Sequence, residues 1–169
     1  GSKLIMPGLV DGHMHTSSSR GWPGIEGASK SAAAGGVTTC VDMPYDVPRP
    51  VTDAGIFKEK VEYVNRLSNV DIALYGTILK SGGVDAIAGL AEAGACSFKL
   101  STYEYDPVRF PRIDHPTMVA AFREIAKTGL MVAVHNEDQE IVVRLTEEAK
   151  AAGNTSPIWH CRTRPPLCE

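Results

Sequence analysis

Short β-rich runs alternate with helical segments along the chain, and this alternation restricts the fold more than any other feature. Residues 37–42 are rich in β-branched side chains and stop before Pro44, and Gly35-Gly36 closes the helical segment that precedes them. Strict alternation predicts parallel strands joined by helical crossovers. We expect strands over residues 4–10, 37–42, 70–79, 95–100 and 130–134, helices over residues 25–34, 53–67, 84–93, 114–127 and 137–152, and loop-like structure over residues 155–169.

A parallel sheet of this kind is either doubly wound or closed into a (β/α)8 barrel. The chemically distinctive residues fall at the carboxyl ends of the first, fourth and fifth expected strands, where barrel enzymes build their sites. The 169 residues hold about five β/α units, whereas a complete barrel takes roughly 250 residues. We therefore expect an α/β fold in which residues 1–169 form part of a (β/α)8 TIM barrel, as an open arc with an exposed edge.

The composition argues against several classes of protein. The chain has 17 basic and 20 acidic residues, a net charge of −3, and lacks a basic block, so we expect no nucleic-acid partner. No apolar run approaches the ~18 residues of a membrane span, and no signal-peptide pattern opens the chain. The four cysteines have no CxxC spacing. These features predict a cytoplasmic protein with reduced thiols and no membrane partner.

Two histidines follow the apolar segment at the start of the chain. His13 and His15 are two residues apart, so in extended backbone both side chains point to the same side. Two neutral imidazoles side by side are ready ligands for Zn²⁺ or a similar metal. A surface turn that happens to contain two histidines is the alternative for this motif taken alone.

Lys99 and His135 occupy comparable positions at the ends of the fourth and fifth expected strands. A lysine on a buried strand must reach solvent or change its charge state, because burying an ammonium is costly. With a lowered pKa it can react with CO₂ to give a carbamate that bridges two metals. Taken singly, Lys99 could be a solvent-facing lysine and His135 a structural histidine, but together with His13 and His15 they indicate a metal site.

Residues 6–15, Met-Pro-Gly-Leu-Val-Asp-Gly-His-Met-His, resemble the opening signature of the amidohydrolase superfamily. More narrowly, the chain resembles the cyclic amidase branch of allantoinases, hydantoinases, dihydropyrimidinases and dihydroorotases. The supporting matches are residues 32–39 with Asp42-Met43-Pro44, then Ser97-Phe98-Lys99, His135 followed by Glu137, residues 110–113 and residues 162–166. The resemblance covers essentially the whole chain.

The resemblance implies a site with two divalent metal ions, with Zn²⁺ as the expected metal. His13 and His15 would bind the first metal, a carbamate on Lys99 would bridge both, and His135 would bind the second. It further implies hydrolysis of the C–N bond of a small cyclic amide by a hydroxide shared between the metals. The full-length parent of such a chain is expected to be a homo-oligomer.

Some parts of the family pattern have no counterpart in this sequence. The branch normally has a small β-domain before the first strand, a further histidine ligand after strand six and a proton-shuttling aspartate after strand eight. We expect these to lie outside residues 1–169, so the chain by itself is expected to be inactive. His160 lies in a Pro-rich segment before the expected sixth strand, which favours a structural or substrate-loop role.

The substrate is indicated by a few positions near the expected ligands. Ser17 stands where dihydroorotases usually have an arginine, which argues against dihydroorotate. Glu104 stands where hydantoinases and dihydropyrimidinases place a tyrosine, and its neighbours Tyr103 and Tyr105 become the candidate substrate-binding residues. Motifs around Trp22, Asp42 and Phe110 are most similar to those of allantoinases, so an allantoin- or hydantoin-like ring is the favoured substrate.

Two other classes of function remain open from the sequence. A non-catalytic relative would keep the barrel as an assembly scaffold and lose ligands, but His13, His15, Lys99 and His135 are all present. A metal-free flavodoxin-like binding protein would need a phosphate-binding glycine loop after the first strand, and the sequence has none there.

Overall fold

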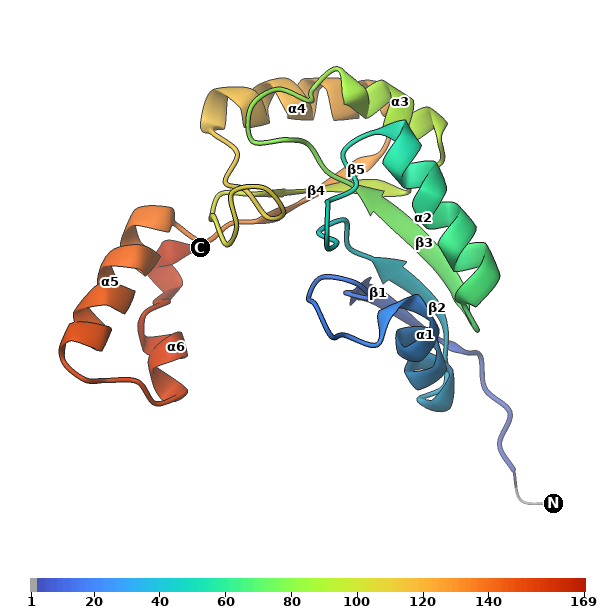
Figure 1. Cartoon of the computed structure of the whole chain (residues 1–169), viewed down its shortest axis with the longest axis horizontal. Coiled ribbons are helices and arrows are strands. Elements are labelled where there is room, and N and C mark those ends of the chain that lie inside the picture. Colours follow the sequence, from blue (N-terminus) through green and yellow to red (C-terminus); the bar gives the residue numbers. More distant parts are fainter. Residues whose placement is uncertain (1–2) are drawn as a thin grey trace.

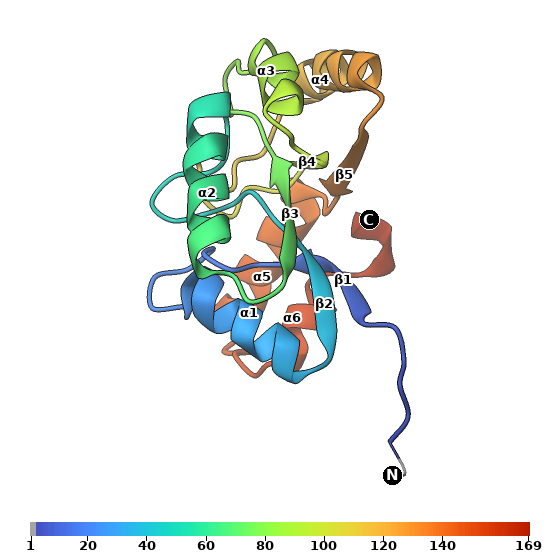
Figure 2. The same cartoon turned by 90° about the vertical axis from the view of Figure 1, so that its right-hand side faces the viewer.

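The computed structural model describes residues 3–169 and contains one five-stranded parallel sheet. Its strands lie in chain order, and every neighbouring pair is parallel. The sheet curls as it progresses from one edge to the other (Figures 1 and 2), which makes it a partial (β/α)8 barrel. The strands are β1 (Leu9–Met14), β2 (Val37–Asp42), β3 (Asp71–Gly76), β4 (Ser97–Ser101) and β5 (Met131–His135).

Helices follow each strand, as the alternation predicted. Figure 1 shows α2, α3 and α4 on the outer face of the curled sheet, whereas α5 and α6 lie apart from it. None of the helices within residues 3–169 has the length and apolar character needed to cross a bilayer. The helices are α1 (Gly24–Ala34), α2 (Ala54–Leu67), α3 (Ala86–Glu92), α4 (His115–Thr128), α5 (Gln139–Ala151), α6 (Ile158–Arg162) and a short 3-10 helix, η1 (Pro166–Cys168).

The main hydrophobic core lies between the sheet and the helices α2, α3 and α4. Phe57 of α2, Leu90 of α3 and Ile125 of α4 pack in one cluster with Phe98 and Leu100 of β4. All five residues of β4 are buried, so this strand is the centre of the packed region. Lys99, between Phe98 and Leu100, is thereby placed on the most enclosed strand of the sheet.

Capping residues set the helix boundaries close to those expected. The Asp53 carboxylate accepts hydrogen bonds from the Gly55 and Ile56 amides at 2.8 and 2.9 Å, and α2 begins after it. The Asp114 carboxylate does the same for the Thr117 amide at 2.9 Å. Helix α4 ends at Gly129, whose φ of 74° is the left-handed conformation that glycine adopts without strain.

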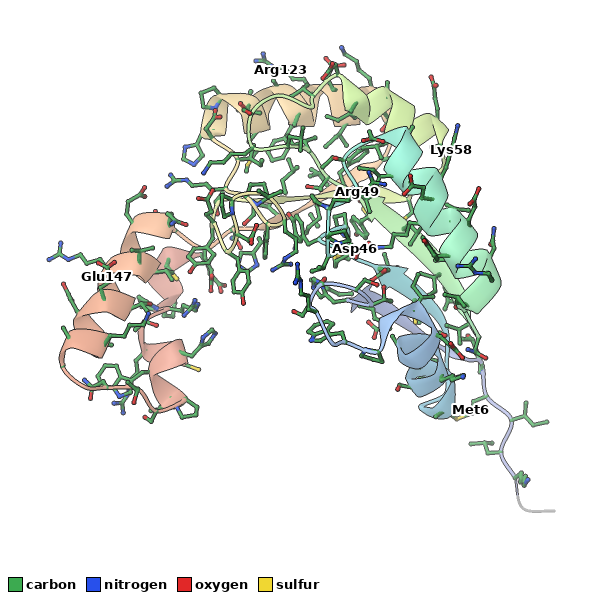
Figure 3. The ribbon with its side chains drawn as sticks, viewed as in Figure 1. Met6, Asp46, Arg49, Lys58, Arg123 and Glu147 are labelled. Atoms are coloured by element: carbon green, nitrogen blue, oxygen red, sulfur yellow. The ribbon has the colours of Figure 1, made fainter. Side chains whose placement is uncertain are left out.

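The expected position of the first strand was wrong. β1 begins at Leu9, where the Leu9 amide donates to the Gly36 carbonyl at 3.0 Å. The apolar residues before it have no neighbouring strand, since β2 itself begins at Val37, and Pro7 lacks an amide. Ile5 is 95% exposed and Met6, labelled in Figure 3, is 65% exposed. His13 therefore lies within β1, and His15 follows its end.

The expectation of loop-like structure over residues 155–169 was also wrong in part. Helix α6 and the 3-10 helix η1 both lie in this segment. The prolines that suggested a loop instead sit at helix starts: Pro157 precedes α6, and Pro166 opens η1. Proline favours the first helical turn because its φ is already helical and no amide is needed there.

Candidate functional site

His13 and His15 project together at the carboxyl end of β1. Their Nε2 atoms are 3.2 Å apart and their ring centroids 5.2 Å apart. Two nitrogens bound to one tetrahedral Zn²⁺ at about 2.0–2.1 Å would be about 3.3 Å apart. The Nδ1 atom of His15 is 2.7 Å from the Ser18 hydroxyl, which leaves its Nε2 for another partner. The spacing of the two Nε2 atoms therefore fits a shared metal ion.

The environment of this pair favours neutral imidazoles. Burial is the main cause that lowers the pKa of His13, followed by the charge of Lys99, and His135 adds a smaller effect that Asp11 opposes. Burial also leads for His15, with His13 next, while Asp42 acts in the opposite direction. Metal binding requires the unprotonated ring, so lowered pKa values suit ligands.

The same interactions show how the curled sheet brings its strand ends together. β2 and β3 separate β1 from β4 in the sheet order, yet the charges of Lys99 on β4 and His135 on β5 act on His13. In the pairing of β4 with β5, Lys99 lies opposite Ala133 and His135 opposite Ser101. The structure thus places all four sequence-predicted ligands at one end of the sheet, on three different strands.

Lys99 is buried on β4, with 8% of its surface exposed. Burial lowers the pKa of its ammonium below the ordinary value. No carboxylate within residues 3–169 forms an ion pair with it at 4.0 Å or less. Its backbone carbonyl accepts a hydrogen bond from the hydroxyl of the buried Tyr45 at 3.2 Å. A lowered pKa is the direction that carbamate formation on this amine requires.

His135 ends β5 and is held by residues that follow it. Its Nε2 lies 3.1 Å from the Glu137 carboxylate, whose other oxygen accepts from Arg164 Nε at 2.7 Å. The His135 carbonyl accepts from the Thr102 amide at 2.9 Å. These contacts fix the ring through Nε2 and leave Nδ1 as the nitrogen for a ligand bond.

The two candidate substrate-binding tyrosines lie in different environments. The Tyr103 ring is 6.2 Å from the His135 ring, with the Arg164 guanidinium 5.9 Å from its centroid. Tyr105 is 70% exposed. Glu104 between them forms an ion pair with Lys80. Tyr103 is thus beside the candidate site, and Tyr105 faces solvent.

The donor set available in this chain is limited. Within residues 3–169 no group of three or more His, Cys, Asp or Glu side chains is arranged to hold a metal ion. The histidine pair and His135 fit two separate metals only if Lys99 supplies a donor to them. The chain thus supplies part of the ligand set expected for two metal ions. It offers two histidines for the first metal, one histidine for the second, and a lysine that would bridge them.

Sequence reasoning missed two of the residues that support the histidines, Lys60 and Arg164. Lys60 of α2 is 6% exposed and pairs at 2.8 Å with Asp42, which in turn accepts a hydrogen bond from the Thr16 amide. A signal for this was available, because Lys60 follows Phe57 by three residues and so lies on the apolar face of its helix. Arg164 was noted only as part of a motif, and nothing in its spacing pointed to Glu137.

Known proteins are similar to this chain over nearly its full length. The allantoinase of Solibacter usitatus is 37% identical over 167 residues, covering 98% of this chain and 36% of the relative. The L-hydantoinase of Paenarthrobacter aurescens is 35% identical over 156 residues, covering 90% of this chain and 34% of the relative. The chain belongs to the amidohydrolase superfamily. No family model matches the sequence.

Solved structures of this superfamily have the same arrangement. L-Hydantoinase (dihydropyrimidinase) from Arthrobacter aurescens superposes with a TM-score of 0.88 and 32% identity, covering 96% of this chain and 36% of that one. Dihydroorotase from Saccharomyces cerevisiae has a TM-score of 0.62 at 18% identity, a likeness of fold alone. The chain spans little more than a third of the length of its allantoinase and hydantoinase relatives.

Proposed function

We propose that this chain forms part of the active site of a metal-dependent cyclic amidohydrolase, which opens an allantoin- or hydantoin-like ring by breaking a C–N bond. The observation that carries the proposal is the pair of Nε2 atoms of His13 and His15, 3.2 Å apart at the end of β1. The relatives support the reaction class, since they are named allantoinase and L-hydantoinase.

Each predicted ligand would have a distinct part in holding the metals. His13 and His15 would bind the first metal through their Nε2 atoms, and His135 would bind the second through Nδ1. Lys99 would bridge the two as a carbamate, for which its burial and lowered pKa are favourable. Two divalent metals, with Zn²⁺ as the expected ion, would supply a water that ionises near neutral pH and a Lewis acid for the ring carbonyl.

Other residues would orient the substrate and the ligands. Glu137 holds the His135 ring, and Arg164 holds Glu137, so the second metal position would depend on both. Tyr103 lies beside His135 and could contact a bound ring, whereas Tyr105 points to solvent. We assign no residue of this chain to proton transfer to the leaving nitrogen.

Three observations indicate which cyclic amide is the preferred substrate. Ser17 occupies the position where an arginine would bind the carboxylate of dihydroorotate, and the likeness to dihydroorotase is one of fold. The most similar sequences given above are an allantoinase and an L-hydantoinase. We therefore propose that the substrate is a small cyclic amide, either allantoin or a hydantoin.

The first test is binding of Zn²⁺ to the 169-residue chain, measured by competition with a chromogenic chelator. His13→Ala and His15→Ala should each weaken binding by about 100-fold or more, because one of two histidine ligands is lost. His160→Ala is the matched control, since His160 is exposed on α6, and it should bind Zn²⁺ as the unaltered chain does.

Two results would count against the proposal. Equal Zn²⁺ affinity in the unaltered chain, His13→Ala and His15→Ala would show that the pair is not a metal site. A protein containing this chain together with the remaining barrel strands, and inert on allantoin, hydantoin and dihydrouracil when loaded with metal, would instead favour a non-catalytic relative.

A further inference from the structure

Three charged side chains are packed together at the end of β2, in contact with the segment that follows His15. Asp42, at the end of β2, is fully buried, Lys60 of α2 is 6% exposed, and the side chain of Asp46 is 14% exposed. Burying charges is costly even when they are paired, and a well-packed apolar set is often as stable or more stable. Stability alone therefore does not account for this cluster.

The Asp42 carboxylate is bound on both oxygens by one residue of the neighbouring strand end. Its Oδ1 accepts from the Thr16 amide at 2.9 Å, and its Oδ2 accepts from the Thr16 hydroxyl at 2.7 Å. Thr16 is itself fully buried. Because Thr16 directly follows His15, Asp42 holds the backbone on the carboxyl side of that histidine.

The backbone on the other side of His15 is held by the sheet. The Met43 amide donates to the Met14 carbonyl at 2.9 Å, and Met14 lies opposite Asp42 in the pairing of β1 with β2. His15 is therefore fixed before and after its own residue, and its ring is fixed by Ser18. These backbone and ring contacts determine the direction in which His15 Nε2 points toward His13.

Lys60 extends from α2 to the end of β2, where its ammonium group contacts three partners. Nζ donates to Asp42 Oδ2 at 2.8 Å, to Asp46 Oδ2 at 2.8 Å and to the Met43 carbonyl at 3.2 Å. The Met43 contact and the Asp42 contact both lie at the end of β2. Lys60 thereby ties the outer helix to the strand end that holds Thr16.

Asp46 completes the cluster without reaching the histidines. Its Oδ1 is buried without a hydrogen-bond partner within residues 3–169, and burial raises its pKa while Lys60 opposes that effect. Among residues 3–169 the ion-pair partner of Asp46 is Lys60, at 2.8 Å. Asp46 therefore balances the ammonium, and the side chain through which Lys60 reaches Thr16 and His15 is Asp42.

We propose that Lys60 is a positioning residue, which acts through Asp42 and Thr16 to aim His15 at the site it shares with His13. The importance of this for catalysis rests on the proposed metal function, whereas the hold on Thr16 is a property of the chain itself. The inference thus makes a claim about geometry and a claim about metal affinity, and each can be measured separately.

The experiment compares Lys60→Met with Lys58→Met in the metal-free chain by amide hydrogen exchange. Methionine keeps the length of the lysine stem and removes the charge, and Lys58 is exposed on the outer side of α2 (Figure 3). In Lys60→Met the Thr16 amide should exchange about tenfold faster or more, because its acceptor loses the charge that fixes it. The Met43 amide, held in the strand ladder, should change much less, and Lys58→Met should change neither.

Metal affinity is the second measurement on the same variants. Lys60→Met should bind Zn²⁺ about 10-fold to 100-fold more weakly, as is usual when an outer partner of a ligand is lost. If the unaltered chain binds no Zn²⁺ but Lys60→Met still accelerates exchange of the Thr16 amide, the metal function is refuted and the positioning role is supported. If Zn²⁺ binds and the Thr16 amide is unaffected by Lys60→Met, the positioning role falls and the metal function stands.

A general loss of stability is distinguished from positioning within the same data. Equal acceleration of Thr16 and Met43 exchange would overturn the inference, because it would show that Lys60 only stabilises the fold. Should Lys60→Met not fold, Thr16→Val decides, since it removes the hydroxyl donor and leaves the Lys60–Asp42 pair intact. That variant should shift the His15 ring nitrogen resonances and weaken Zn²⁺ binding, and unchanged signals would overturn the inference.

Discussion

At the scale of single residues, the candidate site depends on where each histidine ring nitrogen is directed. His15 uses Nδ1 for Ser18 and His135 uses Nε2 for Glu137, so each ring has one fixed and one remaining nitrogen. Burial lowers the pKa of His13 and of His15, and this favours the neutral form of both rings. The residues are thus prepared as metal ligands by their neighbours and by burial.

The lowered pKa values of His13 and His15 have a measurable consequence for stability. The folded pKa of His13 and of His15 lies below the ordinary value of 6.5, so the unfolded chain binds protons first as the pH falls. The free energy of unfolding should therefore decrease as the pH drops through 6.5, with a smaller contribution from the exposed His13 than from the partly buried His15. Above that range neither histidine should contribute to the pH dependence.

Urea unfolding between pH 5 and pH 8, with a chelator present, measures this effect. The double variant His13→Asn/His15→Asn should show a smaller decrease toward acid pH than the unaltered chain. Parallel curves for the two proteins would mean that the histidines have ordinary pKa values in the folded state.

At the scale of elements, short polar contacts join the terminal helices to the strand ends. The Asp138 amide donates to the Cys168 carbonyl at 2.6 Å, and Arg164, just after α6, pairs with Glu137 beside β5. The main core cluster consists of residues up to position 134, so the residues of α5 and α6 lie outside it. The ion pair is therefore a main link between the terminal segment and His135.

Arg164→Ala should lower the free energy of unfolding by about 1–3 kcal/mol, because it leaves the largely buried Glu137 carboxylate without its charged partner. The tautomer of the His135 ring, read from its nitrogen resonances at fixed pH, should also change. Arg162→Ala is the matched control: Arg162 belongs to the same motif but lies over Trp159 at the surface. It should change stability by about 0.5 kcal/mol or less, and an equal effect of both substitutions would contradict the role given to Arg164.

At the scale of the whole molecule, the curled sheet both assembles the site and leaves two edges open. β1 and β5 are the edge strands of the five-stranded sheet. Most of β1 is exposed, including Leu9 at 57% and Val10 at 69%, and Met131 of β5 is 73% exposed. Unpaired strand edges with apolar side chains favour pairing with another chain.

The 169-residue chain should accordingly self-associate as its concentration rises into the tens of micromolar, as measured by light scattering. Val10→Lys should reduce this association, because a charged side chain on an edge strand disfavours pairing between chains. Val119→Lys, which changes a 46% exposed valine on α4, should have little effect. A chain that stays monomeric over this range would refute the prediction.

The sequence by itself determined the class of fold and the identity of the candidate ligands. The alternation of strands and helices and the glycine stop at Gly35-Gly36 are local signals, and the structure confirms them. Local signals could not place the first strand, because the apolar residues 4–8 look like a strand but have no partner to pair with. For the same reason the short helices among the terminal prolines were missed.

Only the tertiary structure decided which residues support the site. Lys60 is 18 residues from Asp42 and Arg164 is 27 residues from Glu137, so their pairing depends on how the elements pack rather than on spacing in the chain. The sequence indicated that His13, Lys99 and His135 end three separate strands, but it could not show that the sheet curls enough for their charges to interact. That curl arises from the packing of five parallel strands against their helices, which no single segment encodes.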